Sequence, residues 1–284
     1  MIDAINVNKL RKNYGTYEVL KEIDFEVKKG EIFALLGING AGKTTTLEII
    51  EGLRKYDSGT ITVNGKIGIQ LQSSSLPAHI KSMEAIKLFA KRNKEKIDYE
   101  MLKKLGIKEI EKKQYFELST GQKRRLNLAL ALVGNPDIIF LDEPTAGLDV
   151  EGRLSLHEQI KYLKSEGKTI VLASHDMAEA EALCDCIAIL NKGNIIFCGT
   201  VSELTEKVGR KYFIHIKTEL ENQTIETNNI EDTLITLLGE FKQKKVKVLD
   251  IKVDRGSLEE HFIEMARRET RWVAFGMDYY CSWS

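Results

Sequence analysis

Residues 37–44 read GINGAGKT and match the spacing G-x-x-x-x-G-K-[ST] in full. Glycines at these places let the backbone curl so that successive N–H groups point at phosphate oxygens. Lys43 supplies a mobile positive charge for the β- and γ-phosphates, and the hydroxyl of Thr44 is a suitable ligand for Mg²⁺, which prefers oxygen. The pattern predicts an ATP site with Mg²⁺, and we expect its contacts to come from Gly37, Ile38, Asn39, Gly40, Ala41, Gly42, Lys43, Thr44 and Thr45.

The elements on either side of this loop favour the same interpretation. Residues 31–36 form a continuous apolar run, which predicts a buried strand. The helix expected over 43–52 adds its positive N-terminal end to the phosphate site. A glycine turn with a solvated lysine is the alternative, and the strand–loop–helix context disfavours it.

A second apolar strand, over 138–143, ends in two adjacent acids, Asp142 and Glu143. Phosphoryl-transfer enzymes with a phosphate loop need an aspartate at such a strand end to hold Mg²⁺. Adjacent strand residues point to opposite faces, so the two acids cannot do the same job without a bend. We assign Asp142 to the metal and Glu143 to a water near the γ-phosphate, which it would activate as a base. A pair of exposed acids opening a loop is the alternative.

Three further segments narrow the choice among proteins with these two motifs. Residues 118–122 read LSTGQ before a basic helix, residues 142–149 read DEPTAGLD, and residues 173–176 read ASHD at the end of the next strand. In this order the motifs closely resemble the ATP-binding cassette of ABC transporters, over roughly residues 1–205. The resemblance implies an ATPase that drives transport.

The resemblance also implies a role for each matching position. Tyr14 would stack on adenine, and His175 would hold the γ-phosphate and the attacking water. Gln72 would link Mg²⁺ and that water to the helical region, with Gln70 as the second candidate. Residues that would face the opposite cassette or the ATP held by it are Ser119, Thr120, Gly121, Gln122 and Asp149.

One departure from the family pattern concerns the signature segment, where the usual LSGGQ appears as LSTGQ. Thr120 replaces a glycine, and a β-branched residue limits the local backbone. Ser119 and Gly121 remain, so we expect the phosphate contact to survive. The histidines that match no motif are interpreted as ordinary: His79, His157, His215 and His261.

The order of elements predicts an α/β fold with a P-loop NTPase core. Alternating residues near the N-terminus indicate antiparallel strands, and strands separated by helices indicate a parallel sheet. We expect one cassette over 1–205, with a helical subdomain at about 73–135. A small α+β domain would follow over 206–268, including a last helix that begins near Ser257, and the tail 269–284 shows no clear period.

Composition limits the class of protein and its partners. The 42 basic and 42 acidic residues of this 284-residue chain balance, so no nucleic-acid partner is expected. Four scattered cysteines (Cys184, Cys186, Cys198, Cys281) suit a reducing cytosol rather than a disulfide framework. Neither a signal peptide nor a run of roughly 20 apolar residues is evident, so a separate permease chain would cross the membrane. We expect the chain on the cytoplasmic face of the cell membrane.

Pairing is expected because the signature would lie on a different face from the phosphate loop. Two cassettes, identical or not, would close head to tail around two ATP molecules, and hydrolysis would loosen them. The short helical region and the C-terminal unit look similar to ABC-2 type exporters of drugs, antibiotics or lipids, with an importer subunit as the alternative. A soluble ABC protein acting on ribosomes or DNA is the rival outside transport. A GTPase would carry N-K-x-D, which residues 191–194 lack.

Overall fold

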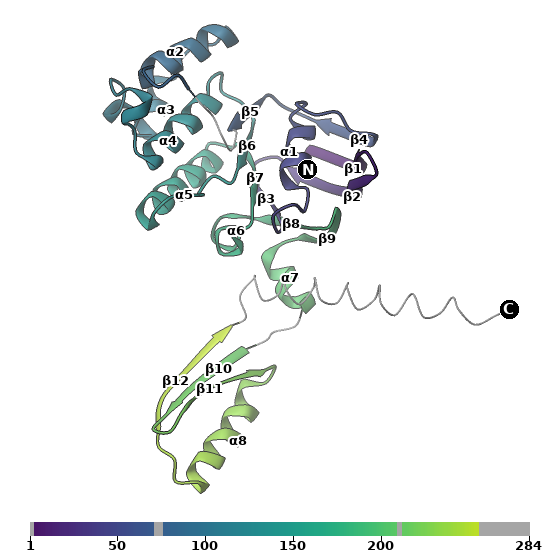
Figure 1. Ribbon diagram of the computed structural model, residues 1–284, viewed down its shortest axis with the longest axis vertical. Coiled ribbons are helices and arrows are strands. Elements are labelled where there is room, and N and C mark those ends of the chain that lie inside the picture. The colour runs from purple at the N-terminus through teal and green to yellow at the C-terminus, as the bar shows by residue number, and fades with distance from the viewer. Residues whose placement is uncertain (1–2, 71–75, 209–211, 256–284) are drawn as a thin grey trace, which may run out of the picture. The chain divides into compact units, whose positions relative to one another are not determined.

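The computed structural model describes residues 3–70, 76–208 and 212–255 (Figure 1). The chain divides after Gly199 into two compact units, which we describe separately. The division comes before the expected boundary at 205, because strand β9 ends at Gly199 and helix α7 (Val201–Val208) belongs to the second unit.

Six strands of the described residues form the main sheet of the first unit, in the order β5-β6-β7-β3-β8-β9. All neighbours are parallel except β8 and β9, which form an antiparallel hairpin at one edge. The predicted parallel sheet is therefore confirmed. Its strands are β3 (Ile32–Leu36), β5 (Ile67–Gln70), β6 (Ile138–Asp142), β7 (Thr169–Ser174), β8 (Cys186–Asn191) and β9 (Asn194–Gly199).

The β8–β9 hairpin explains the segment that resembled part of a guanine motif. Lys192 and Gly193 have φ values of 46° and 84°, which is the backbone of a tight two-residue hairpin turn. Residues 191–194 are therefore a turn between two paired strands.

A second, antiparallel sheet has the order β2-β1-β4. Its strands are β1 (Asp3–Tyr14), β2 (Tyr17–Lys28) and β4 (Ser58–Val63). Ile5 and Val7 of β1 and Ile23, Phe25 and Val27 of β2 are buried, as their alternation predicts, and they join the core of the main sheet. Phe25 of β2 stacks on Phe33 of β3 with ring centroids 5.4 Å apart. The two sheets thus share one apolar core.

Helices cover both faces of the main sheet. Helix α1 (Lys43–Ile50) packs on β6 and β7 and shares a core with Phe140 and Ala173. Since neighbouring strand residues alternate, Leu141 and Leu172 face the other side, toward α4, α5 and α6. Those helices and the rest of the helical region are α2 (Ser82–Asn93), α3 (Tyr99–Lys104), α4 (Thr120–Ala131), α5 (Val150–Ser165) and α6 (Met177–Leu183), with short 3₁₀ turns at Ile107–Glu109 and Tyr115–Glu117.

The second unit is small and mixed. Strands β10 (Tyr212–Thr218), β11 (Asn222–Thr227) and β12 (Val248–Arg255) pair antiparallel in the order β11-β10-β12. Helix α8 (Ile230–Gln243) packs on them through Phe241, with Ile214 and Ile216 opposite. The expected helix near Ser257 and the tail 269–284 lie outside the described residues.

Two negative findings concern the described part of the chain. No helix there has both the length and the apolar character to cross a membrane. Cys184, Cys186 and Cys198 are free thiols there, and burial raises the pKa of Cys184 and Cys186.

Glu51, at the C-terminal end of α1, should make stability depend on pH. Burial first, and then the charges of Asp142 and Glu48, raise its pKa from 4.5 to about 7. The Glu51 carboxyl keeps its proton up to a higher pH in the folded state than in the unfolded state. Its contribution to the free energy of unfolding is therefore fully present below about pH 4.5 and is lost as pH rises through 7. We expect Glu51→Gln to stabilise the nucleotide-free chain by about 2 kcal/mol at pH 8, after allowing for partial exposure, and by little at pH 4.5. Denaturant unfolding at both pH values measures this, and an equal effect at the two would contradict it.

Candidate functional site

The phosphate loop joins β3 to α1, and its glycines serve different purposes. A Cβ on Gly37 would lie 2.4 Å from the carbonyl oxygen of Leu190 on β8, so this position has no room for a side chain. Gly40 and Gly42 have φ values of 82° and 111°, a backbone that favours glycine. The loop therefore begins against the neighbouring strand and reaches the helix through two left-handed residues.

Lys43 is buried and directed back into the loop. Its Nζ donates to the carbonyl oxygens of Gly37, at 2.7 Å, and Ile38, at 3.4 Å. Burial lowers the pKa of Lys43, and the charges of Glu143 and Asp142 oppose this effect. A buried ammonium group at the start of α1 is suited to bind an anion.

Thr44 and Asp142 form the part of the site that could hold a divalent cation. The Thr44 hydroxyl donates to Asp142 Oδ2 at 3.1 Å, and Asp142 Oδ1 is buried with no hydrogen-bond partner among the described residues. Burial raises the pKa of Asp142, while the hydrogen bond from Thr44 lowers it. A hydroxyl beside a carboxylate with an unpaired buried oxygen fits Mg²⁺, whose preferred ligands are oxygens.

Glu143 supplies the bend that two adjacent functional acids require. Its φ is 47°, a left-handed backbone that costs a residue other than glycine about 1 to 2 kcal/mol. Its N–H donates to the carbonyl oxygen of Ala173 at 3.0 Å, which holds the bend against β7. With the chain turned here, Glu143 Oε1 lies 3.7 Å from Lys43 Nζ although Asp142 also faces the loop.

His175 completes this group from the end of β7. Its Nδ1 lies 2.8 Å from Glu143 Oε2, and its side chain is 57% exposed whereas that of Glu143 is 10% exposed. Lys43, Thr44, Asp142, Glu143 and His175 thus come from three segments of the chain and meet at one edge of the sheet. Such a carboxylate can orient a water molecule beside a bound phosphate.

Tyr14 lies at the end of β1 and is 43% exposed. Arg54 donates to its hydroxyl, and the Arg54 guanidinium carbon lies 5.5 Å from the ring centroid. Lys12 Nζ lies 5.3 Å from the same centroid. Tyr14 therefore presents an aromatic ring with cations close to it, but none of its described contacts is with the phosphate loop.

The signature segment differs from expectation in its local structure. We expected residues 118–122 to precede a helix, but α4 begins at Thr120 and Ser119 is its N-cap. Ser119 Oγ accepts from the N–H of Gln122 at 3.3 Å, and Gln122 Oε1 accepts from the N–H of Ser119 at 3.2 Å. These side chains form a capping box, which starts the helix inside the motif. Thr120 is the first residue of the helix and does not have a positive φ, so this position does not require a glycine.

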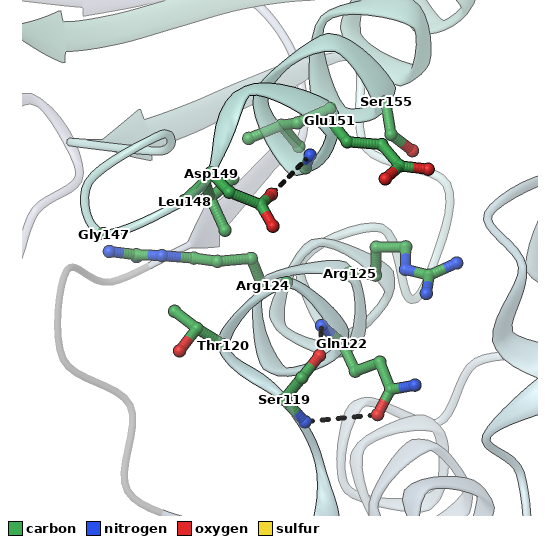
Figure 2. Close-up of a pocket in the computed structure, with 13 residues that line it drawn as sticks. Ser119, Thr120, Gln122, Arg124, Arg125, Gly147, Leu148, Asp149, Glu151 and Ser155 are labelled. Atoms are coloured by element: carbon green, nitrogen blue, oxygen red, sulfur yellow. Dashed lines mark hydrogen bonds between the residues drawn. The ribbon is translucent and has the colours of Figure 1, made fainter.

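The signature and the segment before α5 line one open pocket of about 580 Å³ (Figure 2). Asp149 is the N-cap of α5 and accepts from the N–H of Gly152 at 2.8 Å. Arg124 donates to the carbonyl oxygen of Ala146 at 3.3 Å and links the two segments. The pocket contains no residue of 37–45, and its lining is Ser119, Thr120, Gly121, Gln122, Arg124, Arg125, Gly147, Leu148, Asp149, Glu151, Gly152, Ser155 and Leu156.

The two candidate glutamines have different outcomes. Gln72 lies outside the described residues. Gln70 ends β5 in register with Leu141, so its side chain faces the side of the sheet opposite to Asp142. Both of its amide atoms are buried without a hydrogen-bond partner in the described part of the chain. This register does not direct Gln70 toward the metal ligands.

Sequence reasoning missed a buried group behind His175. Glu179, Ser174 and His157 lie together on the other side of β7. His157 was interpreted as ordinary, and the sequence shows only that Glu179 follows His175 by four residues. No motif signal pointed to this group.

Comparisons with known proteins agree on one family. Residues 20–146 match the family described as ABC transporter. An uncharacterized ABC transporter ATP-binding protein of Methanocaldococcus jannaschii is 38% identical over 273 residues, which cover 93% of this chain and 100% of the relative. The linearmycin resistance ATP-binding protein of Bacillus subtilis is 32% identical over 313 residues, with coverage of 95% and 100%.

Solved structures give the same fold. The structure of an ATP binding subunit of an ABC transporter matches with a TM-score of 0.65 and 27% identity, over 72% of this chain and 92% of that one. The ADP conformation of an ATP-binding cassette matches with a TM-score of 0.67 over 73% and 95%; at 21% identity it supports the fold alone. From these relatives and the geometry above, the chain belongs to the ABC transporter family, as an ATP-binding subunit.

Proposed function

We propose that this subunit hydrolyses ATP to ADP and phosphate with Glu143 as the base. The observation that carries the proposal is the position of the Glu143 carboxylate, 3.7 Å from Lys43 Nζ and 2.8 Å from His175 Nδ1. Lys43 would bind the phosphates and His175 would hold the γ-phosphate and the attacking water. Glu143 would orient that water and accept its proton.

Magnesium fits the oxygens of Thr44 and Asp142. Gln72, which lies outside the described residues, would be a further ligand. When bound, the ion would neutralise charge that develops on the phosphates. The protein's own contribution is to hold these oxygens beside Lys43 and to keep Glu143 bent toward the same place.

Phosphate release by the purified full-length chain tests the proposal. We expect turnover of ATP with Mg²⁺, and its loss when EDTA replaces the metal. Asp142→Asn should lower the Mg²⁺-dependent ATPase activity by more than about tenfold, because an amide is a poorer Mg²⁺ ligand than a carboxylate. Turnover that is indifferent to both EDTA and Asp142→Asn would exclude the proposed metal site.

We also propose that two cassettes pair around ATP. The signature and Asp149 line a pocket of about 580 Å³ that contains no residue of the phosphate loop, so a second cassette is needed to bring the two parts together. The partner is a second copy of this chain or a related cassette. Sedimentation with and without Mg-ATP, alone and with a candidate cassette, distinguishes these cases.

Transport would require a separate permease, since the described helices include none that could span a membrane. The relatives include proteins named for linearmycin and daunorubicin resistance, which favours export of a drug, antibiotic or lipid. The chain would then act at the cytoplasmic face of the membrane. Co-expression with the cognate permease should move the chain into the membrane fraction, and a chain that stays in the supernatant would contradict this assignment.

Tyr14→Ala should weaken ATP binding without abolishing hydrolysis. Stacking of a base on an aromatic ring contributes about 1 to 3 kcal/mol, so we expect the KM for ATP to rise by about five- to 150-fold while kcat changes little. Tyr17→Ala is the matched control, because Tyr17 pairs with Tyr14 across the same hairpin and is 65% exposed. Equal KM values for the two variants would remove Tyr14 from the adenine site.

A further inference from the structure

The side of β7 opposite to the phosphate loop carries a buried carboxylate. Glu179, on α6, is 2% exposed, and its Oε2 accepts a hydrogen bond from the Ser174 hydroxyl at 2.7 Å. Burying a carboxylate is costly unless it is well paired, so an acid at this place needs an explanation beyond packing. Ser174 is the residue directly before His175.

Hydrogen bonds connect the residues on both sides of His175 to Glu179. Ser174 Oγ donates to Glu179 and at the same time accepts from the N–H of Asp176 at 3.0 Å. Asp176 Oδ1 in turn accepts from the N–H of Glu179, also at 3.0 Å. His175 therefore lies in a short loop whose flanking residues are both held by α6, while its own side chain points to the other side of the sheet and meets Glu143.

Two other segments approach the same carboxylate. Thr145, buried and two residues after Glu143, lowers the pKa of Glu179 through its side-chain hydroxyl and so acts on the same carboxyl group. From α5, His157 Nε2 lies 3.7 Å from Glu179 Oε1, and Arg153, one turn earlier, donates to Asp176 at 2.9 Å. The segments that carry Glu143 and His175, and the helix that begins after Asp149, thus converge on Glu179.

We propose that Glu179 is a positioning residue for hydrolysis, which sets the place of His175 relative to Glu143 from the far side of the sheet. This inference rests on the proposed roles of those two residues. Glu179 touches no reacting atom and acts through Ser174 and the segment of Thr145. Burial raises the pKa of Glu179, and the hydrogen bond from the Ser174 hydroxyl opposes this effect because a carboxylate oxygen accepts it.

Variants of Glu179 in the full-length chain test the proposal through the separation of kcat from KM. Small displacements of a catalytic group lower rates strongly, so we expect Glu179→Ala to lower kcat about a hundredfold, with the KM for ATP within about twofold of the wild type. Glu179→Gln keeps one acceptor oxygen for Ser174 and should recover about tenfold of that loss. Glu181→Gln is the control, because Glu181 lies exposed on the same helix.

Ser174→Ala supplies the second arm and is the smaller change if Glu179→Ala does not fold. It should lower kcat about as much as Glu179→Gln, and the double variant should be no worse than either single one, since residues of one network do not act additively. Unchanged kcat in both single variants, or losses in the double variant that multiply, would overturn the proposal. So would a loss of kcat that Glu181→Gln reproduces.

Hydrogen exchange separates this inference from the proposed function. Glu179→Gln should speed amide exchange of the peptide around Asp176 by at least about tenfold, whether or not the chain turns over ATP. If the wild-type chain has no ATPase activity, the proposed function is refuted. The exchange protection around Asp176 can still be measured in that case. Exchange that is unchanged by the substitution would refute the role of Glu179, even with ATPase activity intact.

Discussion

ATP turnover should fall by about 10² to 10⁴-fold in Glu143→Gln, while nucleotide binding survives. The amide has the size of the carboxylate but cannot accept a proton from water. The substitution also removes a negative charge 3.7 Å from Lys43 Nζ, so the lysine stays available to phosphate. Single-turnover phosphate release and equilibrium binding of a fluorescent ATP analogue measure the two effects separately.

The same variant tests pairing, because it should hold ATP without consuming it. We expect Mg-ATP to convert Glu143→Gln, but not the wild type, into a lasting dimer by size exclusion. Glu158→Gln is the control, since Glu158 is an exposed acid on α5. Normal hydrolysis by Glu143→Gln together with a persistent monomer would refute both the base and the paired site.

Lys43→Ala should weaken nucleotide binding itself. Lys43 Nζ is buried, 2.7 Å from the Gly37 carbonyl oxygen, and a hydrogen bond to a charged group contributes about 1.5 to 3 kcal/mol, so the Kd for ATP should rise by more than about tenfold and up to about 150-fold. The substitution also leaves Glu143 without its cation, which adds repulsion toward phosphate. Calorimetric titration with Mg-ATP measures the change.

Lys55→Ala controls for the loss of any positive charge near the site, because Lys55 is exposed and follows α1 closely in the sequence. It should bind ATP as the wild type does. Lys43→Ala with wild-type affinity would mean that residues 37–44 do not form a phosphate site, and every assignment built on that loop would fall with it.

The sequence predicted those parts of the fold in which the local backbone geometry or burial dictates the residue types. A glycine-rich segment between an apolar run and a helix predicted the phosphate loop, and apolar runs at residues 138–141 and 169–173 predicted buried parallel strands, because such strands have no wet face. Alternation near the N-terminus predicted the antiparallel sheet for the opposite reason. These patterns are local, so they can be recognised without the rest of the fold.

What the sequence could not show depends on contacts between distant segments. The two adjacent acids required a bend, but the sequence did not show that Glu143 itself takes a left-handed φ or that Ala173 on the next strand holds it. The helix start at Thr120 was missed because the whole of residues 118–122 was expected to precede the helix, although Ser119 and Gln122 have the spacing of a capping box. Glu179 looks like any acid on a short helix until Ser174 is folded against it.

The close approach of Gly37 to Leu190 has a consequence for how affinity is achieved. Because the loop begins pressed against β8, and the hairpin after β8 is itself fixed by a hydrogen bond from Lys21 N–H to the Gly193 carbonyl oxygen at 2.8 Å, much of its conformational entropy is lost during folding. ATP then meets a preorganised cradle and does not bear that ordering cost. Substitutions that loosen the β8–β9 hairpin should therefore weaken nucleotide affinity without touching ATP, because the phosphate loop of the nucleotide-free protein would have more conformational entropy to lose on binding.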